Sequence, residues 1–184
     1  MATPAELTTL LDRNRSFAKQ FEAGDLKGRP RLKTSILSCL DPRVDPAHIF
    51  QLELGDAAVL RTAGGRVTPG VMRDLAILGM LAAGAPGVGG GPALLLVIHH
   101  TDCGTARLAI PEVGEQFAKR LGVSNEVVAA IAVTDPAATV RADIEKLRQA
   151  PGAPDSLIVG GFVYHVTSGT IEQVVAAAPL RSPS

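Results

Sequence analysis

Short hydrophobic runs separated by turn residues predict the strands of this chain. The runs lie at residues 32–38, 56–62, 93–98 and 156–166. Residues 167–175 are expected to turn into a last edge strand, and apolar positions at helical spacing predict helices over 69–84 and 136–149. Because strands alternate with helices, we predict an α/β fold with a mostly parallel central sheet flanked by helices.

The helix after Thr68 has a clear start signal. Thr68 offers a hydroxyl at the N-cap, and Pro69 fits the first helical position. The side chains of this helix expected to face a core are Leu75, Leu78 and Met80. The glycine-rich residues 85–92 lack the Gly-Lys-Ser/Thr ending of a phosphate-binding loop and precede a strand, so we expect an ordinary loop there.

The first segment has the pattern of an amphipathic helix that leads into the sheet. Over residues 5–22, the apolar side chains that fall near one side of a helix are Leu7, Leu10, Leu11, Phe17 and Phe21. A connection broken by glycine and proline follows. We therefore divide the chain into an N-terminal helical arm (1–29), a single α/β domain (30–178) and a short tail (179–184).

Composition agrees with a buried parallel sheet. The 184 residues suffice for one domain with a core. Hydrophobic residues make up 46% of the chain but aromatic residues only 3%, so the core must be built from Ala, Val, Leu and Ile. That composition suits parallel strands covered by helices. The formal net charge is zero, which argues against nucleic acid or an anionic membrane as a partner.

The sequence also indicates the compartment. No apolar run approaches the roughly 20 residues that span a bilayer, and the N-terminus lacks the basic start and apolar stretch of a secretory signal. Two cysteines do not make a disulfide scaffold. We expect a cytoplasmic, reduced protein whose cysteines bind a metal or react.

Both cysteines follow predicted strands. Cys39 comes directly after the run at 32–38, and Cys103 follows the run at 93–98. The carboxyl ends of strands in an open α/β sheet line the crevice where sites are built, so we expect the two cysteines to meet there. The segments CLDPR and HHTDC around them hold two thiols, two imidazoles, two carboxylates and a guanidinium. Zinc accepts such a mixture of sulfur and nitrogen ligands, and a catalytic zinc keeps a fourth position open.

Each of these residues also has an ordinary structural interpretation. A buried cysteine is often a small hydrophobic side chain, Asp41 before Pro42 can start a turn, and a histidine can be a hydrogen-bonded group at the sheet edge. A disulfide is disfavoured in a reducing compartment, and thiol redox chemistry lacks the Cys-x-x-Cys motif. The concentration of both cysteines of the chain in these two segments favours the metal site.

The two segments resemble the β-class carbonic anhydrases through the motifs Cys-x-Asp-x-Arg and His-x-x-Cys-Gly. The residues that carry these motifs are Cys39, Asp41, Arg43, His100, Cys103 and Gly104. The stretch LELGDAAVLRTAGGRVTP resembles the family's second strand and its Arg-Asn-Ala-Gly turn, and GGFVYHVTSGTIEQV resembles its closing strand and hairpin. The resemblance covers roughly residues 30–175, and HHTDCG is closest to the family's small branch.

The resemblance implies a zinc-dependent hydration of CO2. Cys39, His100 and Cys103 would bind Zn²⁺, with water or hydroxide as the fourth ligand, whose pKa zinc lowers to about 7. Attack of the hydroxide on CO2 would give bicarbonate and a proton. Asp41 would accept a hydrogen bond from the hydroxide, and Arg43 would hold Asp41 through a charge-assisted bidentate bond. In a closed state, Asp41 would itself be the fourth ligand.

The family's motif makes His100, rather than His99, the ligand. Adjacent residues of a strand point to opposite faces, so His99 is expected to pack or to bond to a group behind the site, and it is also a candidate for proton transfer. We expect His48 and His165 to be structural or surface residues. Thr62 stands where the family usually has Asn, and the Trp used for bicarbonate regulation in some members is absent.

The resemblance also implies an oligomer and leaves alternatives for the substrate. The family's pocket is partly lined by the neighbouring subunit, which implies a homodimer or a dimer of dimers with the N-terminal arm wrapped across it. Carbonyl sulfide and carbon disulfide hydrolases resemble the small branch and carry the same ligand pattern. A non-catalytic zinc-binding relative is a further alternative; the Asp41 and Arg43 pair argues against it, because a structural zinc site does not need that pair.

Overall fold

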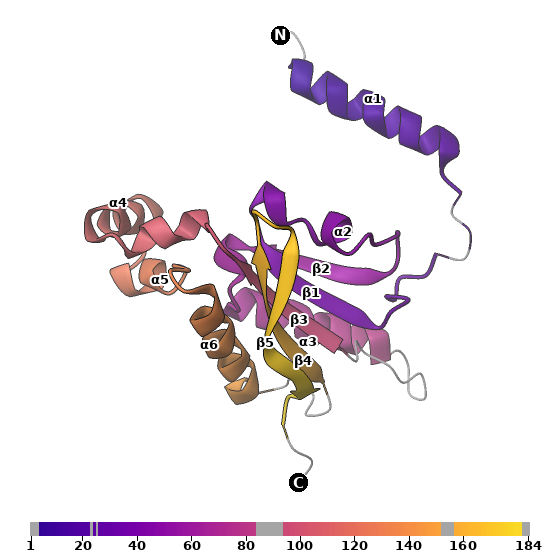
Figure 1. Ribbon diagram of the computed structural model, residues 1–184. Helices are drawn as coiled ribbons and strands as arrows, with labels where there is room; N and C mark the ends of the chain where they lie inside the picture. The colour runs from indigo at the N-terminus through magenta and orange to yellow at the C-terminus, as the bar shows by residue number, and fades with distance from the viewer. Residues whose placement is uncertain (1–3, 23, 25, 84–93, 152–156, 182–184) are drawn as a thin grey trace.

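A five-stranded sheet forms the centre of the protein (Figure 1). The computed structural model describes residues 4–22, 24, 26–83, 94–151 and 157–181. The strands are β1 (Thr34–Cys39), β2 (Ala57–Thr62), β3 (Leu94–His100), β4 (Ile158–His165) and β5 (Thr170–Pro179). Their order is β2-β1-β3-β4-β5, with β5 antiparallel to β4 and all other pairs parallel. The predicted mostly parallel sheet flanked by helices is confirmed.

The observed strands differ from the predicted ones mainly at their ends. β1 begins at Thr34 rather than residue 32, because Lys33 has a left-handed backbone with φ of 49° that interrupts the extended chain. β3 continues two residues beyond the predicted run, since His99 and His100 pair with Val163 and Tyr164 of β4. This extension brings His100 to the end of the strand. The loop predicted at 85–92 lies outside the described residues.

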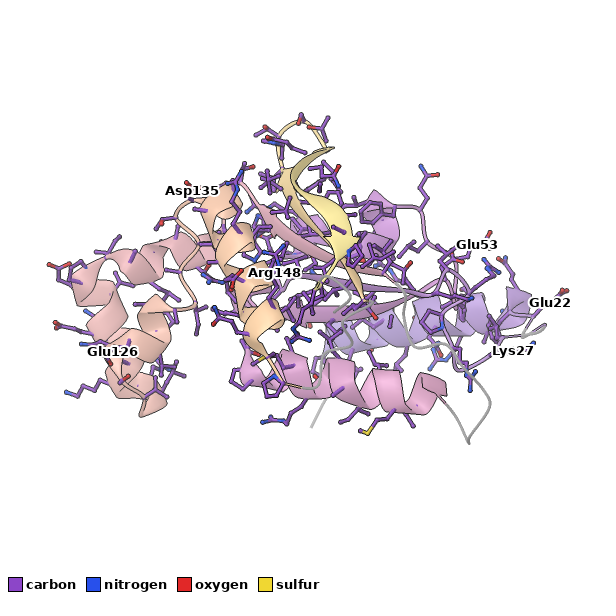
Figure 2. All side chains as sticks on the ribbon, turned by 90° about the horizontal axis from the view of Figure 1, so that it is seen from below. Glu22, Lys27, Glu53, Glu126, Asp135 and Arg148 are labelled. Carbon is purple, nitrogen blue, oxygen red and sulfur yellow. The ribbon has the colours of Figure 1, made fainter. Side chains whose placement is uncertain are left out.

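Helices connect and cover the strands. They are α1 (Ala5–Gln20), α2 (Pro46–Ile49), α3 (Pro69–Ala83), α4 (Pro111–Leu121), α5 (Asn125–Ala129) and α6 (Pro136–Gln149). Three 3-10 turns are η1 (Pro42–Val44), η2 (Ala63–Gly65) and η3 (Gly104–Ala109). The predicted helices correspond to α1, α3 and α6. Helices α4 and α5 were not expected; they form a lobe beside the sheet, with Glu126 of α5 at its outer end (Figures 1 and 2).

The main core lies between the sheet and α6, which packs against β3 and β4. Its largest members include Leu95 of β3 and Ile144 of α6, both fully buried. Close approach of α6 requires Gly161 in β4, where an added Cβ would lie 2.4 Å from Val140 Cγ1. The expectation for Met80 is wrong: its side chain is 67% exposed, because α3 turns it away from the sheet.

Helix α1 stands apart from the sheet (Figure 1). All of its residues are described, and none is buried. Its exposed apolar side chains are Leu7, Leu10, Leu11 and Phe17, with Phe21 directly after the helix. Among the described residues, no helix has the combination of length and hydropathy needed to cross a membrane.

Candidate metal centre

Three potential metal ligands converge at the carboxyl ends of β1 and β3. Cys39 is the last residue of β1, His100 is the last residue of β3, and Cys103 follows in the turn before η3. The two sulfurs and a ring nitrogen of His100 all lie within 4.8 Å of one another, and all three residues are buried. Tetrahedral zinc with bonds of about 2.0–2.3 Å separates its ligand atoms by roughly 3.5 Å, which this arrangement can accommodate.

The imidazole of His100 is oriented for metal binding. Its Nδ1 lies 2.9 Å from the carbonyl oxygen of Thr101, so Nδ1 carries the proton and donates to that oxygen. Nε2 is therefore the lone-pair nitrogen, and it is buried without a hydrogen-bond partner among the described residues. A buried polar atom of this kind needs a ligand. The donor set of two sulfurs and this nitrogen fits zinc.

The protonation of the cysteines also favours a cation. A hydrogen bond with Cys39, supported by His100 and by the Thr105 hydroxyl 3.1 Å away, lowers the pKa of Cys103 to about 3. The same pairing raises the pKa of Cys39. Burial alone would lower the pKa of His100, but the Cys103 sulfur and the Thr101 carbonyl raise it above its usual value. The lowered pKa of Cys103 favours a thiolate at this position, and a thiolate attracts a cation.

Asp41 and Arg43 form a bidentate ion pair beside the ligands. Arg43 Nε donates to Asp41 Oδ1 at 3.0 Å, and Nη2 donates to Oδ2 at 2.7 Å. Asp41 also caps η1 by accepting a hydrogen bond from the Arg43 backbone N–H. The Arg43 side chain holds the pKa of Asp41 down, at about 2, against the opposing effect of burial. Asp41 is therefore an ionised acceptor at neutral pH.

Arg61 of β2 positions the segment that carries Cys39 and Asp41. Its Nε donates to the Cys39 carbonyl at 2.8 Å, and its Nη2 donates to the Asp41 carbonyl at 2.6 Å. This role of Arg61 was not predicted, although the residue lies at the end of a predicted strand beside the glycine turn. Thr62, the departure from the family pattern, donates its hydroxyl to the Arg66 carbonyl at 3.0 Å. Thr62 thus stabilises the turn η2.

The turn η2 is pressed between the ends of β1 and β3. Gly65 has φ of 69°, and an added Cβ would lie 2.7 Å from the Ile98 carbonyl and 3.3 Å from the Cys39 amide nitrogen. A side chain at this position would push apart the two strands that carry the ligands. The absence of a side chain at Gly65 therefore lets η2 lie close to the strand ends that carry Cys39 and His100.

His99 points away from the ligand cluster, as the strand alternation predicts. It is fully buried, its Nδ1 lies 2.8 Å from the Thr139 hydroxyl, and its Nε2 lies 3.4 Å from Asp143 Oδ2. A side chain enclosed in this way does not lead to solvent, so we discard His99 as a proton-transfer group. His48 is exposed, and His165 lies 3.1 Å from Glu172 on the β4–β5 hairpin.

Asp143 of α6 is a buried hub behind the site. It accepts two hydrogen bonds from Arg66, at 2.7 and 2.9 Å, one from the Val67 amide and one from Lys146. Burial acts to raise its pKa, but the nearby His99 and the hydrogen bonds from Arg66 and Lys146 hold the pKa of Asp143 well below its ordinary value. The hub connects α6 to η2 and to β3.

Replacing Asp143 by asparagine is expected to lower the free energy of unfolding by about 3 kcal/mol at pH 7, because a buried guanidinium loses its counter-charge. The folded-state pKa is depressed, so this contribution is complete above the unfolded pKa of about 4. It disappears as the pH falls through the lower folded-state value. Urea unfolding of both proteins should give a constant difference from pH 7 to pH 5 and a smaller one below pH 4; a difference that grew on acidification would contradict this account.

Comparison with known proteins agrees with the geometry. A family model described as carbonic anhydrase matches residues 34–151. The chain is 27% identical to β-carbonic anhydrase 1 of Mycobacterium bovis over 89% of this chain and 94% of that protein. It superimposes on the crystal structure of carbonic anhydrase from Streptococcus mutans with a TM-score of 0.77 and 30% identity, covering 94% of this chain and 99% of the other.

Carbon disulfide hydrolases are a second kind of relative, and a solved structure of one superimposes with a TM-score of 0.60 and 23% identity over 90% of this chain and 90% of the other. A carbon disulfide hydrolase of Saccharolobus solfataricus is 33% identical over 93 residues, which is 50% of this chain and 42% of that protein. The family match extends over more than half of the chain and includes all three potential metal ligands. With its sheet, its cysteine–histidine–cysteine cluster and its relatives, the chain belongs to the β-carbonic anhydrase family.

Proposed function

We propose that the protein catalyses the reversible hydration of CO2 to bicarbonate and a proton, with zinc held by Cys39, His100 and Cys103. The observation that carries this proposal is the cluster of three ligands with an ionised Asp41 beside it. Three protein ligands rather than four are typical of a catalytic zinc, which keeps a position for water. When bound, zinc acidifies that water and makes it a nucleophile at neutral pH.

The residues around the ligands supply orientation. Asp41 is ionised, so it accepts a hydrogen bond from the attacking water. This bond orients a lone pair of the water toward the substrate carbon. Arg43 fixes the carboxylate plane through two parallel hydrogen bonds. Arg61 holds the backbone on which Asp41 is mounted. Positioning of this kind is a large part of the rate advantage of a reaction between two small molecules.

Carbonyl sulfide or carbon disulfide is the second candidate substrate, favoured by the relative that hydrolyses carbon disulfide. Two relatives that are 27% and 30% identical over 89% and 94% of the chain are named carbonic anhydrases, whereas the solved carbon disulfide hydrolase that covers 90% of the chain is 23% identical, and this difference in identity supports CO2. Stopped-flow CO2 hydration should be measured beside sulfide release from carbonyl sulfide and carbon disulfide on one zinc-quantified preparation. Fast CO2 turnover supports the proposal, whereas sulfide release without CO2 hydration would replace it.

We also infer a homodimer, or a dimer of dimers built from it, in which α1 packs on a second copy. An isolated 16-residue helix is marginal in water, and the apolar side chains of α1 are exposed. We propose a cytoplasmic location and no nucleic-acid partner. We likewise propose that residues 1–29 form an arm distinct from the domain of residues 30–178 and the short tail of residues 179–184.

Replacing Leu10 and Phe17 of α1 together by serine is expected to convert the oligomer to a monomer, because each apolar side chain contributes about 1.5–3 kcal/mol when it is buried. Light scattering after size exclusion gives the mass of each variant. The matched control changes the exposed polar residues Arg13 and Thr9 of the same helix to glutamine and serine and should leave the mass unchanged. A monomeric wild-type chain would contradict the inference.

A further inference from the structure

Asp102 lies in the segment HHTDC, and the proposed reaction assigns no function to its carboxylate. It lies between His100 and Cys103, in the turn after β3. Its backbone has φ of 54°, in the left-handed region that glycine adopts freely and aspartate tolerates better than most residues. Glycine would fit this turn at the lowest cost. What Asp102 adds to the turn is therefore its carboxylate.

That carboxylate reaches Arg43 from the side opposite Asp41. Asp102 Oδ2 accepts a hydrogen bond from Arg43 Nη1 at 2.8 Å, and the Asp102 carbonyl accepts one from Nη2 at 3.0 Å. Arg43 Nε and Nη2 donate to Asp41. All three nitrogens of the guanidinium are thus engaged, and the guanidinium is held between two carboxylates.

The two carboxylates come from different segments and differ in exposure. Asp41 follows β1, Asp102 follows β3, and the side chains of Asp41, Arg43 and Asp102 are 14%, 49% and 76% exposed. Held by Asp41 alone, a half-exposed arginine could swing together with its partner as one unit. A second anchor on a separate strand end removes that freedom, because it fixes the guanidinium plane relative to the ligands.

We propose that Asp102 is a positioning residue for the hydration reaction. It holds Arg43 so that Asp41 keeps the orientation in which it accepts a hydrogen bond beside the metal ligands. It acts through Arg43 and does not contact the substrate. This role rests on the proposed function, whereas the restraint on Arg43 can be measured without any substrate.

The restraint is tested on zinc-loaded protein by NMR of the Arg43 side-chain Nε–H. Asparagine in Asp102→Asn has nearly the same size as aspartate and also tolerates the left-handed backbone, but it carries no charge. Exchange of the Arg43 Nε–H with water should become about five-fold faster, the scale of a lost exposed ion pair. Glu115→Gln, which removes an exposed charge on α4, is the matched control and should change nothing. An unchanged rate in Asp102→Asn would overturn the proposal.

The consequence for turnover is tested by a double-mutant cycle. Asp102→Asn should lower kcat about five-fold with KM and zinc content unchanged, and should have no further effect in an Arg43→Gln background. The variant Asp102→Gly should show the same decrease in kcat as Asp102→Asn. Its melting temperature should equal or exceed that of the wild type, because glycine relieves the backbone strain. An equal loss in both backgrounds, or a loss explained by zinc release, would overturn the proposal. A wild-type protein without CO2 turnover would instead refute the proposed function, while the exchange measurement still decides whether Asp102 restrains Arg43.

Discussion

Replacing Cys103 by serine is expected to lower the affinity for zinc by about a thousand-fold, a share of the roughly 10–16 kcal/mol that a complete structural zinc site contributes. The hydrogen bond with Cys39 and the nearby His100 and Thr105 lower the pKa of the Cys103 thiol, which favours the zinc-binding thiolate at neutral pH. A serine hydroxyl stays protonated and neutral there. CO2 hydration should fall in proportion to the zinc lost.

Zinc affinity of this variant is measured by competition with a chromogenic chelator. The matched control is Val133→Thr, which places a hydroxyl in the same buried cluster as Cys39 and Cys103 without removing a ligand. That control should bind zinc as the wild type does. Full zinc affinity in Cys103→Ser would remove Cys103 from the ligand set.

Replacing Asp41 by asparagine is expected to lower kcat for CO2 by about a hundred-fold, the scale of the loss when a reactant is misplaced, while one zinc per chain remains. Asp41 is ionised and can only accept hydrogen bonds. Asparagine has nearly the same shape, but its amide donates two hydrogen bonds. The nucleophile would then be oriented wrongly without loss of a metal ligand.

Stopped-flow turnover with zinc quantified on the same sample checks this prediction. Asp135→Asn is the matched control: Asp135 caps α6 (Figure 2), and asparagine caps a helix equally well. Its turnover should equal that of the wild type. A wild-type rate in Asp41→Asn would mean that the carboxylate has no part in the reaction, and a drop that merely follows zinc loss would make Asp41 a structural residue.

The sequence was sufficient to predict the sheet and the residues that meet at its edge. The apolar runs locate the strands because a buried strand needs side chains of that kind over its whole length. Parallel neighbours then bring the carboxyl ends of β1 and β3 together, as the positions of Cys39, His100 and Cys103 show. The extra length of β3 was not predictable from the run, since histidines extend the strand only through pairing with β4.

The polar contacts around the site could not be predicted in the same way. Arg61 and Asp102 act through bonds to residues distant in sequence, and hydropathy carries no information about such pairs. The charged residues of α6 alternate along the sequence, as is typical of an exposed helix face. Asp143 is nevertheless fully buried against Arg66. The exposure of Met80 also depends on how α3 meets the sheet.

The most direct test of the account is titration of zinc into metal-free protein while CO2 hydration is followed by stopped flow. Turnover is expected to rise in proportion to bound zinc and to reach its maximum at one zinc per chain, because each chain contributes one set of Cys39, His100 and Cys103. Turnover that is absent at full occupancy, or that is independent of zinc, would contradict it.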